Sequence, residues 1–335
     1  MMLKPRISFI GQFFILLGLV GAGMVFGGLI GMMLWSKMTG ISIIGLDPAA
    51  LEKTILSPAY RNATIIFQLI TTFFMFFVPA QVFAAIVSRK SMVHLGFNSR
   101  ANIGQVAMVA GIVFAGLFVV AMLGDLTKLI PLPAATEAYY KKLEASYVEQ
   151  IKAIAVMHNT TDYLVVVGVI ALAPAIFEEV LFRGALQQLF VRWFKHAGFA
   201  ILLTALIFSA VHFSYYGFFA RFALGIVLGY IFYYSKNIWL SILAHFLNNA
   251  AAVTGLYFIT RAGKPLTPEA MEESYPYWVG ILATAALIAG IIIFKKLSAK
   301  PAAYNQSDAV LLSDNYSNPF NNNSPEGHNN DITKL

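Results

Sequence analysis

The chain has 335 residues, of which 59% are hydrophobic and only 12% are charged, whereas soluble domains carry about a quarter charged residues. This composition excludes an ordinary soluble domain. The net charge of +7 comes from lysines and arginines in short loops and near the chain ends. This distribution is typical of a membrane protein with several spans rather than of a nucleic-acid-binding protein. The absence of cysteine excludes disulfides, thiolate metal ligands and cysteine nucleophiles.

The predicted elements are eight apolar helices, each able to cross a hydrocarbon core of about 20 helical residues. The first follows a basic N-terminus but is too long for the apolar region of a signal peptide, so we expect it to be retained. The sequence thus predicts an all-α, polytopic membrane helix bundle. The expected spans are residues 8–35, 63–87, 104–125, 162–190, 198–215, 217–235, 238–258 and 276–295.

Composition divides the chain into four parts. Residues 1–126 hold the N-terminal transmembrane helices, and residues 127–161 form an extracytoplasmic loop with an amphipathic helix. Residues 162–298 form the helix bundle that contains the polar residues considered below. Residues 299–335 are polar and rich in asparagine, and we expect them to be a disordered cytoplasmic tail.

Basic residues predict the orientation, because cytoplasmic loops carry the excess of lysine and arginine. If the chain has eight spans, these loop lysines and arginines all lie on the same side of the membrane. Both termini are therefore expected to be cytoplasmic. The compact layout without an organellar sorting signal favours a bacterial inner membrane. These basic residues are Lys4, Arg6, Arg89, Lys90, Arg100, Arg192, Lys195, Lys236, Lys295, Lys296 and Lys300.

Glycines recur every four residues in two spans, at Gly23, Gly27 and Gly31 and again at Gly225 and Gly229. Small residues at this spacing let membrane helices approach closely. We expect both sets to pack inside the bundle rather than to form a dimer seam.

Two adjacent carboxylates, Glu178 and Glu179, lie inside the fourth span. Ionisable residues within a span are costly and therefore indicate function. Glu179 and Arg183 are four residues apart, so they share a helix face and are expected to form an ion pair. Glu178 points about 100° away, which leaves its carboxylate free for acid–base chemistry.

The following spans add His212 and the pair His245 and Asn249, which share one face of the seventh span. Histidine and amide groups on one face can donate hydrogen bonds to a developing oxyanion. Glu178, His212 and His245 are equally a ligand set for a divalent metal such as Zn²⁺, and the residues leave both chemistries open. Arg221 is expected to extend to the membrane interface.

The chain contains no His-Glu-x-x-His, no Gly-x-Ser-x-Gly and no Gly-x-Gly-Asp motif, which argues against zincins, serine hydrolases and intramembrane aspartyl proteases of the usual kind. Three segments resemble the motifs of the CPBP family, the CAAX protease and bacteriocin-processing (Abi) family. "EEVLFR" at 178–183 resembles its EExxxR motif, "FSAVH" at 208–212 its FxxxH motif and "HFLNN" at 245–249 its HxxxN motif.

This resemblance implies an intramembrane endopeptidase with an eight-helix core. The resemblance further implies that Glu178 and His212 activate a water molecule. It assigns the oxyanion hole to His245 and Asn249, and the support of the site to Glu179 and Arg183. No cofactor is required, or else a divalent metal is used. The implied partners are membrane lipid and a peptide or protein substrate, including membrane-associated or prenylated ones, and no nucleic acid.

Two other classes of function stay open. A non-catalytic scaffold or regulator could bind a partner helix or lipidated tail in the same cavity, although it would not need all four polar residues. A proton-coupled transporter would also use intramembrane Glu and His, but transporters usually consist of repeated halves, and residues 1–150 contain no second copy of the motifs.

Overall fold

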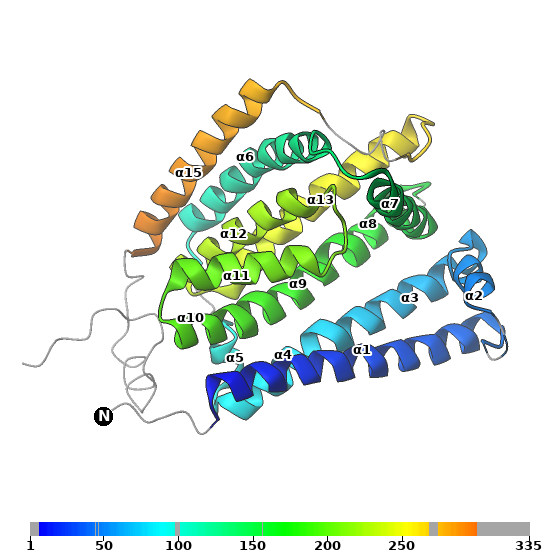
Figure 1. Cartoon of the computed structure of the whole chain (residues 1–335), viewed down its shortest axis with the longest axis horizontal. Coiled ribbons are helices and arrows are strands. Elements are labelled where there is room, and N and C mark those ends of the chain that lie inside the picture. The colour runs from blue at the N-terminus through cyan, green and yellow to red at the C-terminus, as the bar shows by residue number, and fades with distance from the viewer. Residues whose placement is uncertain are drawn as a thin grey trace, which may run out of the picture.

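The computed structural model describes residues 7–43, 45, 47–97, 101–155, 157–267 and 274–299. All regular secondary structure in these residues is helical, and seven of their helices are long and apolar enough to cross a membrane. The long helices pack side by side (Figure 1). The predicted all-α, integral membrane fold is therefore confirmed.

The N-terminal helices form one edge of the bundle (Figure 1). The first span is α1, and the second is a continuous helical run with a π-helical segment, η2, in its middle. Gly23 and Gly27 of α1 face this run so closely that a Cβ at Gly27 would lie 2.7 Å from the Cβ of Phe74. The expected packing role of these glycines is confirmed. The elements are α1 (Phe9–Thr39), α2 (Pro48–Ile55), η1 (Pro58–Tyr60), α3 (Arg61–Thr72), η2 (Phe73–Phe77) and α4 (Val78–Val87).

The opposite edge is formed by α6 (Ile103–Lys128) and α15 (Tyr277–Ala299), which pack along one another (Figure 1). Asn102 caps α6 by accepting from the backbone N–H of Gln105, which defines the start of the span. The short helix α5 (Ser91–His94) precedes it. The amphipathic helix expected in the long loop is α7 (Ala134–Ile154), which buries Val148, Ala153 and Ile154.

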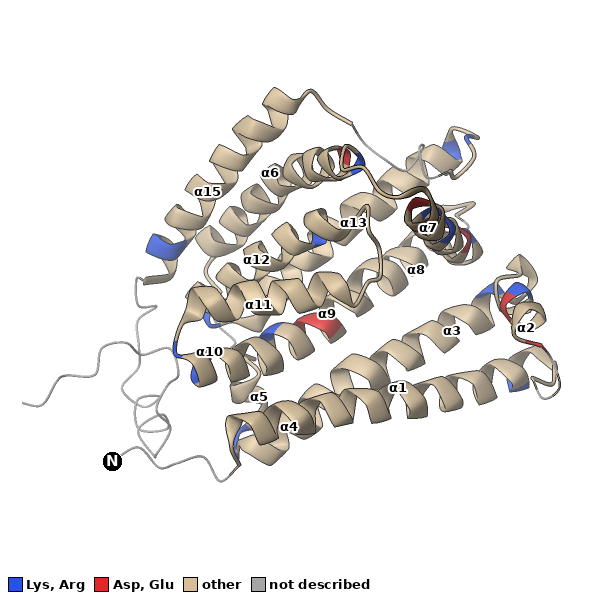
Figure 2. Cartoon of the chain, in the orientation of Figure 1, with Lys and Arg blue, Asp and Glu red and all other residues tan. Residues whose placement is uncertain are grey.

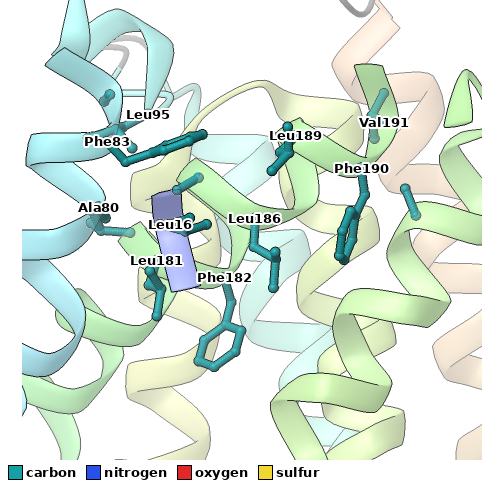
Figure 3. Close-up of a cluster of buried hydrophobic side chains, with 14 of the residues drawn as sticks. Leu16, Ala80, Phe83, Leu95, Leu181, Phe182, Leu186, Leu189, Phe190 and Val191 are labelled. Atoms are coloured by element: carbon teal, nitrogen blue, oxygen red, sulfur yellow. The ribbon is translucent and has the colours of Figure 1, made fainter. Parts of the chain in front are cut away.

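The fourth span crosses the middle of the bundle as one helical run, Thr160–Phe194, with two π-helical segments. Residues 179–191 of this run are all buried. Phe182, Leu186 and Leu189 of this segment pack against Leu16 of α1 and Phe83 of α4 (Figure 3). The run consists of α8 (Thr160–Val166), η3 (Val167–Leu172), α9 (Ala173–Glu179), η4 (Val180–Gln187) and α10 (Gln188–Phe194).

The next three helices are α11 (Ala197–Ala210), α12 (Phe218–Ser235) and α13 (Ile238–Arg261). The expectation of a helix over 198–215 is wrong at its end, because α11 stops at Ala210. A 14-residue helix rises only about 21 Å, so α11 is shorter than the other spans. His212 therefore lies in the turn after α11 and not inside an apolar helix, and Phe213 follows with a φ of 51°.

Most charged residues lie near the helix ends, whereas an acidic segment on α9 and a basic segment beside it lie in the middle of the bundle (Figure 2). The acidic segment contains Glu178 and Glu179, and the basic segment contains Arg183. The predicted orientation of the termini stays a prediction, since Lys4, Arg6, Arg100 and Lys300 lie outside the described residues, as does the expected disordered tail from residue 300 onward.

Candidate active site

The Glu179 carboxylate is the centre of a buried polar network. Its Oε1 accepts a hydrogen bond from Arg183 Nη1 at 2.6 Å, and both side chains are fully buried. The same oxygen lies 3.0 Å from His245 Nδ1 on α13, and the other oxygen accepts from Ser241. The predicted ion pair is present, and it also joins the fourth span to α13.

Arg183 is fixed from further sides. Its Nη2 donates to the backbone carbonyl of Gly225 on α12 at 3.2 Å, and its guanidinium lies 4.7 Å from the centre of the Phe208 ring. A guanidinium above an aromatic face gains cation–π energy, most of all where water is excluded. Arg183 therefore connects three helices besides neutralising Glu179.

Glu178 differs from its neighbour in burial and in hydrogen bonding. Its side chain keeps 13% of its exposure, and its Oε2 lies 4.0 Å from His245 Nε2, which is too long for a hydrogen bond. This oxygen is buried and has no hydrogen-bond partner among the described residues. A buried carboxylate oxygen without a donor is costly, so the site is prepared for a molecule that the chain itself does not supply.

His212 lies near His245, and the two side chains both contact Phe208. Its Nδ1 lies 2.7 Å from the Phe208 carbonyl, which can only accept, so Nδ1 carries the proton and Nε2 is free to accept in the neutral ring. The imidazoles of His212 and His245 both pack against the Phe208 ring, at centroid distances of 5.0 and 5.8 Å.

Asn249 is one turn beyond His245 on α13, as the spacing predicts. Its Oδ1 accepts from Asn248 Nδ2 at 3.3 Å, which leaves the Asn249 amide N–H groups for another acceptor. The structure thus joins Glu179, Arg183 and His245 by direct bonds and places Glu178 and His212 beside them. Among the described residues, Asn249 lies next to the network and makes no direct hydrogen bond to it.

Sequence reasoning missed two parts of this network. Ser241 binds the second oxygen of Glu179, and its position four residues before His245 on α13 was the available signal, because i and i+4 share a face. The carbonyl of Gly225 could not be found this way, since backbone acceptors depend on helix contact rather than on residue type.

The candidate metal ligands can be compared with the geometry that a metal site requires. Within the described part of the chain, no group of three or more His, Asp or Glu side chains is arranged to hold a metal ion. The candidate ligands Glu178, His212 and His245 therefore do not form a ligand set in this arrangement.

The fold and the site together define an integral membrane protein with a polar site inside the helix bundle. In this site, one carboxylate and two histidines lie around a buried ion pair. Residues 160–251 match the family of type II CAAX prenyl endopeptidase Rce1-like proteins, and this segment contains Glu178, His212 and His245. The match confirms the resemblance found from the three motifs and supports a CAAX-type protease that acts on a peptide or protein substrate. No curated protein and no solved structure matches the chain.

Proposed function

We propose that this protein is an intramembrane endopeptidase that hydrolyses a peptide bond with a water molecule activated by Glu178 and His212. The observation that carries the proposal is the Glu178 carboxylate, whose buried Oε2 has no hydrogen-bond partner in the part of the chain that the structure describes and lies 4.0 Å from His245 Nε2. It lies within the segment that matches the CAAX-type endopeptidases.

Glu178 acts as the general base. A water molecule held between its carboxylate and Nε2 of His212 gives a proton to Glu178, and the hydroxide attacks the carbonyl carbon of the substrate. Collapse of the tetrahedral intermediate breaks the C–N bond, and the proton passes from Glu178 to the leaving amine. Proton transfer of this kind contributes about 10²- to 10⁴-fold to a rate.

His245 and Asn249 stabilise the oxyanion. The Nδ1 proton of His245 is held by Glu179 at 3.0 Å, so Nε2 donates to the oxyanion when the ring is an imidazolium. The amide of Asn249 supplies a second donor. Preorganised donors in a dry site are usually the largest contribution to such catalysis.

The test compares the wild type with Glu178→Ala and Glu178→Gln in detergent. The substrates are quenched peptides that include farnesylated tails and their unmodified counterparts. We expect wild-type cleavage and a loss of about 10²-fold or more in kcat/KM in both variants, with the thermal midpoint nearly unchanged. Glu149→Ala is the matched control, because that carboxylate is exposed and pairs with Lys152 on the same helix, away from the site.

Wild-type activity in Glu178→Ala would overturn the assignment of the base. If neither the wild type nor the variants cleave any peptide, while the wild type is folded and binds the same peptides, the protein is a binding protein rather than an endopeptidase. Cleavage of farnesylated peptides in preference to unmodified ones would establish a prenylated substrate.

A further inference from the structure

The turn that joins α11 to α12, residues 211–217, carries His212. The histidine itself is exposed, and its ring contacts Phe208 of α11 at a centroid distance of 5.0 Å. Phe213 follows with a φ of 51°, where the chain changes direction. An exposed side chain is not locked by core packing. The elements that hold this turn therefore also decide where the imidazole points.

The turn is closed on the side of its own two helices. The buried Ser209 hydroxyl donates to the Phe218 carbonyl at 2.6 Å, and Ser214 Oγ accepts from the backbone N–H of Gly217 at 3.2 Å. Arg221 of α12 packs here too, since its Cζ lies 2.8 Å from the place where a Cβ on Gly217 would be. Its Nη1 is buried, so the expectation that it extends to the membrane interface is wrong for this nitrogen.

The helix α7 holds the turn from its other side with two side chains of one face. Tyr140 stacks on Tyr215, with ring centroids 5.1 Å apart and an interplanar angle of 27°. Four residues later, on the same face of the helix, Glu144 Oε2 accepts from Ser214 Oγ at 3.3 Å. The two contacted residues lie two and three positions after His212, so α7 grips the turn directly beside the histidine.

The far end of α7 is fastened to the rest of the bundle. Arg61 Nε, at the start of α3, donates to the backbone carbonyl of Ile154 at 3.0 Å. The Ile154 side chain packs with Ile65 of α3 and Val169 of the fourth span. Because α7 is anchored there, its other half can restrain the turn rather than move with it.

We propose that α7 positions His212 for catalysis, with Tyr140 and Glu144 as the positioning residues. By holding Tyr215 and Ser214, they keep His212 Nε2 where it orients the attacking water. The proposal rests on the proposed function, which gives the histidine its role. Neither residue of α7 touches the reacting atoms in this account, since both act through the turn.

The first experiment measures cleavage of the quenched peptides by three variants of α7. Tyr140→Ala should lower kcat about 10- to 100-fold, as a misplaced catalytic group does. KM should change little, because the variant disturbs the alignment of the histidine rather than the binding of the peptide. Tyr140→Phe keeps the stacking ring and should restore wild-type kinetics. Tyr147→Ala removes an exposed tyrosine of the same helix and should behave as the wild type.

The second contact is tested with Glu144→Gln and Glu144→Ala. The amide oxygen of glutamine still accepts from Ser214, so kcat should stay as in the wild type. Alanine removes the acceptor and should lower kcat, by less than Tyr140→Ala does, because a hydrogen bond of 3.3 Å between partly exposed groups is weak.

The third experiment observes His212 without turnover. The chain has six histidines, and in protein labelled with ¹³C-histidine the nuclear magnetic resonance signal of His212 is the one that His212→Gln removes. Tyr140→Ala should shift or broaden this signal, and Tyr147→Ala should leave it in place. The signal of His245, assigned in the same way with His245→Gln, should stay unchanged in both variants.

A double-mutant cycle separates positioning from general loss of structure. Tyr215→Ala should reproduce Tyr140→Ala from the side of the turn, and the double variant should lose no more activity than either single one, because both changes remove the same contact. Losses that multiply would overturn the proposal, as would equal losses of kcat in Tyr140→Ala and Tyr147→Ala or an unmoved His212 signal in Tyr140→Ala. If the wild type cleaves no peptide, the proposed function fails, and the His212 signal alone then decides whether α7 positions this side chain.

Discussion

At the scale of single residues, two adjacent carboxylates have opposite surroundings. Glu179 is fully buried and bonded to Arg183, His245 and Ser241, whereas Glu178 keeps 13% of its exposure and has an unpartnered oxygen. Because neighbouring residues on a helix point about 100° apart, one glutamate can complete a closed network while the other faces an open site.

We expect Glu179→Gln to destabilise the protein, because it leaves the buried charge of Arg183 without its counter-ion. Breaking a buried pair in this way costs about 3–5 kcal/mol. The free energy of unfolding can be measured in detergent by circular dichroism, with Glu178→Gln as the matched change one residue away. Equal stability of the two glutamine variants would contradict a structural role for the Glu179 network.

We expect His94, which lies outside the membrane spans, to make the stability of the protein depend on pH. Its Nε2 is buried without a described partner, and burial together with the nearby charge of Arg192 lowers the pKa of His94 from 6.5 to about 3. Between these values the unfolded chain binds the proton and the folded chain does not. Stability should therefore be complete above pH 6.5 and fall as the pH drops toward 3, by at most about 1.4 kcal/mol per unit.

The measurement is the thermal midpoint from pH 7.5 to pH 4 for the wild type and His94→Gln. Glutamine cannot titrate, so the difference between the two curves isolates His94 from the carboxylates. Parallel curves would show that His94 does not contribute.

At the scale of elements, the contact between α11 and α12 positions part of the site. A Cβ on Gly225 would lie 2.9 Å from Ala205 Cβ, and one on Gly229 would lie 2.8 Å from Ile201 Cγ2. The carbonyls of these glycines also accept hydrogen bonds from Arg183 and Gln187. Close approach of α12 therefore serves the network as well as the packing.

Gly225→Ala should push α11 and α12 apart and lengthen the bond from Arg183. Overpacking of this kind costs about 1–3 kcal/mol, and we also expect lower peptidase activity. Gly28→Ala is the control, since a Cβ there meets nothing within 4 Å. If Gly225→Ala is as stable and active as Gly28→Ala, then α12 can shift without affecting Arg183, and the prediction is wrong.

Most of these elements could be predicted, and the exceptions have physical causes. Long apolar runs define the spans because the bilayer requires about 20 residues. The end of α11 was misplaced because Val211 and Phe213 continue the apolar run although the backbone turns there. Hydropathy detects apolar side chains and does not detect where a helix stops.

At the scale of the whole molecule, the eight predicted crossings place the two ends of the chain on one side. The absence of cysteine makes this testable. Single cysteines at the exposed positions Lys142 on α7 and Lys296 on α15 should react from opposite sides of the membrane, and Lys296→Cys only from the cytoplasm. Labelling both from outside with an impermeant maleimide would contradict the predicted topology.

The sequence by itself determined the membrane class, the spans, the family resemblance and the pairing of Glu179 with Arg183. These follow from composition and from spacing along one helix, and both are local. Only the tertiary structure decided which groups meet across helices. It brought Ser241 and His245 to Glu179 and placed His212 in the turn after α11. Such contacts depend on how closely and at what rotation helices pack, which residue order along one helix does not specify.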